Sequence, residues 1–194
     1  MPATCSNSNR DRHEDGTQLT QKSWRDERKE RETACILPAH ITNPIQRIII
    51  TASGDLQRIL SALYNHRIHV DIIYNEVVPS GTGSSTNNAA AADTSLSIDR
   101  QVNLICNSKI VCRATSAIKL ISDRAKKLLL LQKVAIGQLF MQLGVNPEFN
   151  LLDLGFNQDT SFYRLYSLSS SDVVCEIKEE FPAGMLDPLF IHLS

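Results

Sequence analysis

The chain has 194 residues, of which 42% are hydrophobic and 21% charged, and its formal net charge is -1. This length accommodates one domain with a hydrophobic core and additional tails. A nearly neutral chain has no overall field to recruit nucleic acid or an anionic membrane, so we expect neither partner. No apolar run approaches the ~18 residues of a membrane-spanning helix. The polar N-terminus contains no apolar signal-peptide stretch, so we predict a cytoplasmic location.

The first 36 residues are predicted to be a disordered, charged tail. Residues 10–15 and 24–32 interleave acidic and basic side chains and contain almost no apolar stripe. The second run is compatible with a transient helix, because opposite charges recur three or four positions apart. We therefore expect the ordered domain to span residues 37–185, followed by a C-terminal surface tail at residues 186–194.

The pattern of apolar residues within this domain predicts two helices, a strand, a long loop and a hairpin, followed by two more helices and three strands. Low-complexity residues 79–97 are predicted to be a flexible insertion between two strands. Consecutive strands with short turns favour an α+β domain: an antiparallel sheet of about six strands with helices packed on it. In chain order we predict helices at 44–50 and 55–64, strands at 68–78, 98–106 and 110–120, helices at 123–132 and 134–143, and strands at 148–156, 162–169 and 173–181.

Cysteines and short motifs point to no metal site or cofactor. The five cysteines form no CxxC pair, and an odd number without a secretory signal argues against a disulfide framework. Phosphate-binding, esterase and metalloprotease signatures such as GxGxxG, GxSxG and HExxH are absent. The histidines form no pair at ligand spacing and no catalytic dyad.

Two charged residues stand in the middle of alternating segments. Arg100 lies in segment 97–104, and Glu179 lies in segment 174–182. Buried charge is costly unless it is paired or used, so a cation and a carboxylate on the inner face of one sheet would be functional candidates. Alternation places Glu179 on one face of its strand and Glu176 and Glu180 on the other. A β-bulge would change this assignment, so Glu176 and Glu180 remain alternatives.

Several short segments, taken in order, resemble the chorismate pyruvate-lyase family, especially its chorismate-lyase-like branch. The similarity extends over residues 40–185, and effector-binding domains of some bacterial transcription regulators share the family's fold. The segments that resemble the family are residues 46–60, 70–78, 100–104, 114–116, 136–140, 164–166 and 178–182.

The resemblance implies a pocket for a small aromatic carboxylate, of the chorismate or 4-hydroxybenzoate type. It implies that Arg100 binds the carboxylate and that Glu179 contacts the opposite end of the ring. Backbone groups of Ile136 and Gly137, and main chain near Asp55, are implied to contact the ligand.

The implied reaction converts chorismate to 4-hydroxybenzoate and pyruvate without metal or covalent intermediate. A carboxyl group in a dry pocket keeps its proton at neutral pH, so Glu179 is hypothesised to be a general acid toward the departing ether oxygen. Arg164 lies between apolar neighbours on a strand. It either supports Glu179 or the substrate or forms a structural salt bridge.

Two other functions remain open on the sequence alone. One is a non-catalytic binding module that retains the pocket without turnover. The other is a domain with a collapsed pocket, acting through protein interactions of its charged N-terminal arm. The oligomeric state is not predicted.

Overall fold

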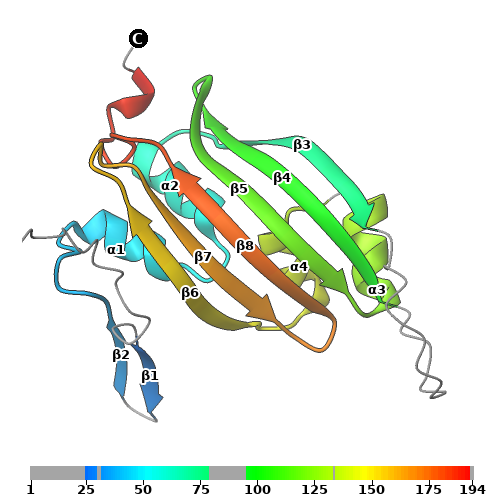
Figure 1. The fold of residues 1–194 in the computed structure, drawn as a ribbon. Coiled ribbons are helices and arrows are strands. Elements are labelled where there is room, and N and C mark those ends of the chain that lie inside the picture. The colour runs from blue at the N-terminus through cyan, green and yellow to red at the C-terminus, as the bar shows by residue number, and fades with distance from the viewer. Residues whose placement is uncertain (1–24, 30–31, 79–94, 133, 193–194) are drawn as a thin grey trace, which may run out of the picture.

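The computed structural model describes residues 25–29, 32–78, 95–132 and 134–192. It contains one antiparallel six-stranded sheet with four α-helices on one side, as the sequence predicts (Figure 1). The helices are α1 (Pro44–Thr51), α2 (Leu56–Tyr64), α3 (Asp123–Lys126) and α4 (Ile136–Leu143). The strands of this sheet are β3 (His69–Val78), β4 (Leu96–Cys106), β5 (Lys109–Leu120), β6 (Glu148–Phe156), β7 (Phe162–Ser169) and β8 (Val173–Phe181).

The chain builds this sheet from two successive units of the same design. Each unit is a pair of helices followed by three consecutive antiparallel strands: α1, α2 and β3–β5 in the first unit, and α3, α4 and β6–β8 in the second. The strand order is β3-β4-β5-β8-β7-β6, so the two units meet at β5 and β8. The sheet is therefore approximately symmetric about this central pair of strands.

Strand register shows how closely the two units correspond. β3 has an irregularity between Ile72, opposite Val102, and Tyr74, opposite Gln101. β6 has the equivalent irregularity between Leu151, opposite Tyr166, and Asp153, opposite Leu165. Both edge strands are thus bulged at the same place relative to their neighbours. This correspondence allows the two units to be compared residue by residue.

Local sequence explains where the helices begin and end. The Asn43 side chain accepts hydrogen bonds from the first-turn amides of α1, and Pro44 occupies the first helical position. α4 ends at Gly144, which adopts a left-handed conformation with φ of 73°. The predicted helix 123–132 is α-helical only through α3 and continues as a π-helical turn, Lys127–Leu131.

Two hydrophobic clusters lie between the helices and the sheet. One gathers mainly under α1 and α2 and includes Leu60, whereas the other gathers under α3 and α4 and includes Leu139. On β8 alternate residues from Val173 to Phe181 are buried, as expected for a strand with one face against the core.

Two sequence-based boundaries differ in the structure. Residues 25–29 (β1, Arg25–Lys29) and 32–36 (β2, Glu32–Ile36) pair as an antiparallel ribbon, where a disordered tail was expected; the rest of that predicted tail, residues 1–24 and 30–31, lies outside the described residues. β4 begins at Leu96, inside the predicted insertion 79–97, of which residues 79–94 are likewise not described.

The C-terminal segment is not a free surface tail. Met185 and Ile191 are buried, and a short 3-10 helix spans Phe190–His192. The Tyr64 hydroxyl donates to the Met185 carbonyl at 2.6 Å, and the Asn107 amide donates to the Ile191 carbonyl at 2.9 Å. These contacts attach the segment to α2 and to the β4–β5 hairpin.

Candidate functional site

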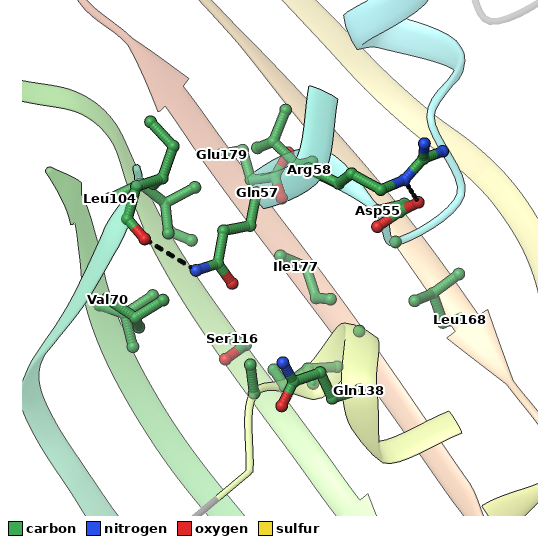
Figure 2. A pocket seen from close by; sticks show the side chains of 18 of the residues that line it. Asp55, Gln57, Arg58, Val70, Leu104, Ser116, Gln138, Leu168, Ile177 and Glu179 are labelled. Atoms are coloured by element: carbon green, nitrogen blue, oxygen red, sulfur yellow. Dashed lines mark hydrogen bonds and ion pairs between the residues drawn. The ribbon is translucent and has the colours of Figure 1, made fainter. Parts of the chain in front are cut away.

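A cavity of about 640 Å³ lies between the sheet and the N-terminal parts of α2 and α4. Figure 2 shows Ser116, Ile177 and Glu179 on adjacent strands facing this space, with Gln57 of α2 and Gln138 of α4 around it. Both hydrophobic clusters contribute lining residues, so the cavity lies where the two units meet. Its volume falls within the range of small-molecule sites.

Arg100 lines this cavity and has little compensation for its charge. Only 3% of the residue is exposed. Its NH1 group donates one hydrogen bond to the Val134 carbonyl at 3.2 Å, and its Nε has no partner. Burial lowers the pKa of Arg100, and no acidic side chain among the described residues pairs with it. A buried cation in this state is a strong attractor for an anionic ligand.

Glu179 lines the same cavity but has a complete set of partners. Its Oε2 accepts from Arg164 Nε at 2.7 Å, and its Oε1 accepts from the Tyr166 hydroxyl at 2.9 Å. The general-acid hypothesis requires Glu179 to donate a proton to the substrate, whereas both of its oxygens accept hydrogen bonds from other side chains in this geometry. Glu179 is placed instead to accept a hydrogen bond or a proton.

The alternatives to Glu179 lie on the opposite face of β8. Glu179 is 5% exposed, whereas Glu176 is exposed and Glu180 is half-buried. Glu180 pairs with Lys178 at 3.0 Å on that outer face. Strand alternation therefore holds through this part of β8, and neither alternative reaches the cavity.

Arg164 is a structural partner rather than a lining residue. It is fully buried behind Glu179, and its guanidinium lies 4.3 Å from the centre of the Tyr166 ring. Its NH1 group donates to the carbonyls of Ile49, Ile50 and Ala52 at the end of α1. Burial alone would lower the pKa of Arg164, but the Glu179 carboxylate raises it above its ordinary value. Of the alternatives that the sequence leaves open for Arg164, the structure shows the salt bridge with Glu179, and Arg164 is not among the residues that line the cavity.

The two buried arginines occupy corresponding positions in the two units. Arg164 on β7 lies directly opposite Glu179 on β8. Arg100 on β4 lies directly opposite Ser116 on β5. The second unit thus supplies a carboxylate to its arginine, whereas the first unit supplies a short hydroxyl side chain and leaves space beside the guanidinium.

The remaining predicted ligand contacts lie at the cavity wall. Ile136 and Gly137 form the first turn of α4, whose amides have no intrahelical acceptor. A methyl group on Gly137 would lie 2.3 Å from the Gly54 carbonyl oxygen, so only glycine permits this close approach of the two loops. Asp55 lines the rim, and its exposed carboxylate pairs with Arg58 rather than facing the interior.

Sequence reasoning missed two residues of the site, Ser116 and Tyr166. Tyr166 is buried, lines the cavity, and its pKa is raised well above the ordinary value by burial and by the neighbouring Glu179. Its position two residues after Arg164 on an alternating strand was the available signal. Ser116 carried no signal of its own, because its importance comes from facing Arg100.

The described part of the chain shows no group of three or more histidine, cysteine, aspartate or glutamate residues that could hold a metal ion. Cys106, Cys112 and Cys175 are buried free thiols. No helix among the described residues is long and apolar enough to cross a membrane. Comparison with protein-family models and with curated proteins found no match to this chain.

Proposed function

We propose that this chain is a chorismate pyruvate-lyase-like enzyme, which converts chorismate to 4-hydroxybenzoate and pyruvate. The observation that carries the proposal is the unmatched cation: Arg100 is buried, lines the cavity and faces Ser116 where the other unit has Glu179. A guanidinium in this position suits a ring carboxylate, which it can bind through two parallel charge-assisted hydrogen bonds.

The spacing of the two charged residues supports a ring held between them. Arg100 and Glu179 lie on strands separated by β5 and are offset by two residues along the sheet. Strand spacing and rise place their Cα atoms about 12 Å apart. Apolar lining residues such as Val102 and Ile177 flank this interval. A cyclic carboxylate would thus present its acid group to Arg100 and the opposite end of its ring to Glu179.

The proposed reaction is an elimination that makes the ring aromatic. In chorismate the carbon opposite the carboxylate carries a hydroxyl and a hydrogen, and the adjacent carbon carries the enolpyruvyl ether. Ionised Glu179 accepts the ring proton, and the electron pair of that C–H bond forms the new ring double bond. The adjacent C–O bond breaks, and its electrons leave with the enolpyruvyl oxygen. Protonation of the departing group at its methylene carbon yields pyruvate.

This proposal is tested by incubating the purified chain with chorismate and measuring pyruvate and 4-hydroxybenzoate together. Glu179→Gln keeps the shape of the side chain but removes its charge and basicity. We expect turnover to fall at least about a hundredfold, within the range of a general base. Glu176→Gln is the matched control on the exposed face of the same strand and is expected to keep wild-type turnover. Unchanged turnover in Glu179→Gln would remove this residue from the mechanism.

The second function is a binding module for an aromatic carboxylate. Both oxygens of Glu179 already accept hydrogen bonds, an arrangement that also suits a rigid acceptor for a ligand hydroxyl. Calorimetry with 4-hydroxybenzoate separates the two functions. Binding that depends on Arg100, with no pyruvate released from chorismate, would identify the module. Absence of both binding and turnover would contradict both functions.

A further inference from the structure

The two edges of the sheet differ in how much apolar surface they leave exposed. Ile72 and Ile73, at the bulge of β3, are 40% and 48% exposed. Their counterparts on β6, Leu151 and Leu152, are half-buried. β3 is ten residues long, and β4 is its only partner strand among the described residues. A long edge strand with exposed isoleucines at its centre is a template for pairing with another strand.

We propose that β3 pairs with β3 of a second copy of this chain, forming an antiparallel dimer with one continuous sheet. A two-fold axis between Ile72 and Ile73 would place Ile72 of each copy opposite Ile73 of the other copy. The same axis places Val70 opposite Asn75, Asp71 opposite Tyr74 and His69 opposite Glu76.

The bulge makes this register possible. In a regular strand, residues separated by an odd number of positions face opposite sides, and they cannot pair across a two-fold axis. The irregularity between Ile72 and Tyr74 shifts the alternation by one residue. Asp71 and Tyr74 therefore face the same side, since their β4 partners, Asn103 and Gln101, are two residues apart. The same relation holds for Val70 and Asn75, opposite Leu104 and Arg100.

Charge complementarity favours the same register. Glu76 lies directly opposite Asp99 on β4, and neither carboxylate has an ion-pair partner among the described residues. Like charges in this position destabilise a strand pair. The proposed dimer brings His69 of the partner subunit beside Glu76, at both ends of the interface. The imidazole of His69 thus lies beside two carboxylates that have no ion-pair partner among the described residues.

The dimer would also extend the wall of the cavity. Val70 is one of the residues that line the cavity. The register sets Asn75 of the partner subunit beside Val70 on the same face of the sheet, so each copy would contribute a polar side chain next to the other's cavity.

The experiment is sedimentation velocity of the full chain from about 1 to 100 μM, the range of weak and moderate protein association. Wild type is expected to shift from monomer to dimer across this range. Ile73→Lys, which places a charge at the two-fold axis, is expected to raise the dimer Kd at least about tenfold, as for a residue at the centre of an interface. Ile48→Lys, at an exposed isoleucine of α1, is the matched control and is expected to leave the Kd unchanged.

A charge exchange separates loss of the dimer from loss of the fold. Glu76→Lys is expected to weaken the dimer while keeping or raising the melting temperature, because Lys would pair with Asp99 within the chain. Adding His69→Glu restores opposite charges across the interface and is expected to recover most of the dimer. A wild-type chain that stays monomeric to 100 μM would overturn the proposal. So would a dimer that tolerates both Ile73→Lys and Glu76→Lys.

Discussion

The two units of this domain differ most where they correspond most closely, at their central arginines. Arg164 in the second unit has a carboxylate and three carbonyl oxygens as partners, whereas Arg100 in the first unit has one carbonyl. Each arginine also binds the helical layer of the other unit: Arg164 the end of α1, and Arg100 the carbonyl of Val134 before α4. One arginine is thus held in an internal ion pair, whereas the other lies beside the cavity without a carboxylate partner among the described residues, and we propose that this second arrangement serves ligand binding.

The largest expected effect comes from breaking the buried ion pair of the second unit, Arg164 with Glu179. Arg164→Met leaves Glu179 as a buried carboxylate without a cation and leaves carbonyls at the end of α1 without a donor. Loss of one partner of a buried ion pair costs about 3–5 kcal/mol. We expect the free energy of unfolding, measured by urea denaturation, to fall by that amount.

Removing both charges tests the cause of that loss. Arg164→Met combined with Glu179→Gln leaves no uncompensated ion, so the double variant is expected to be more stable than the sum of the two single effects. Additive losses would contradict the coupling between Arg164 and Glu179 that the contacts indicate.

The sequence predicted the sheet and helices well because their signal is local. The strands β6, β7 and β8 match their predicted ranges, and β7 and β8 alternate over eight and nine residues, whereas the bulge interrupts the alternation of β6. The packing of the C-terminal segment was not predicted, because Met185 and Ile191 are isolated apolar residues without a period. Their burial depends on α2 and the β4–β5 hairpin, which are distant in sequence.

The candidate site shows the same limit. The family resemblance selected Glu179, alternation placed Glu176 and Glu180 on the other face of the strand, and the structure places Glu179 at the cavity. The partners of Glu179 were not accessible in this way, because they depend on the register between β7 and β8. The lack of a carboxylate partner for Arg100 could not be predicted either, because it depends on the strand register that places Ser116 opposite Arg100.

The second largest expected effect comes from a substitution that gives the first unit a carboxylate at the position where the second unit has Glu179. Ser116→Glu places a carboxylate opposite Arg100, where the second unit has Glu179. The new side chain would occupy the position proposed for the ligand's carboxylate and neutralise the cation. We expect the affinity for 4-hydroxybenzoate, measured by calorimetry, to fall at least about tenfold, or ~1.4 kcal/mol. Ser116→Gln has a similar size without the charge and is expected to weaken binding less. Equal losses in the two variants would assign the effect to bulk alone.

The smallest expected effect on stability comes from removing Arg100 itself. A buried cation without a carboxylate is a cost to the fold, and its replacement by an apolar side chain of similar volume is often neutral or stabilising. Arg100→Met is therefore expected to change the free energy of unfolding by less than about 1 kcal/mol, in contrast to Arg164→Met. Binding of 4-hydroxybenzoate should nevertheless be lost, while Arg113→Met, at an exposed arginine on neighbouring β5, should leave binding intact. A large loss of stability in Arg100→Met would show that the two arginines are equivalent supports of the fold, and that the contrast between the two units does not mark a ligand site.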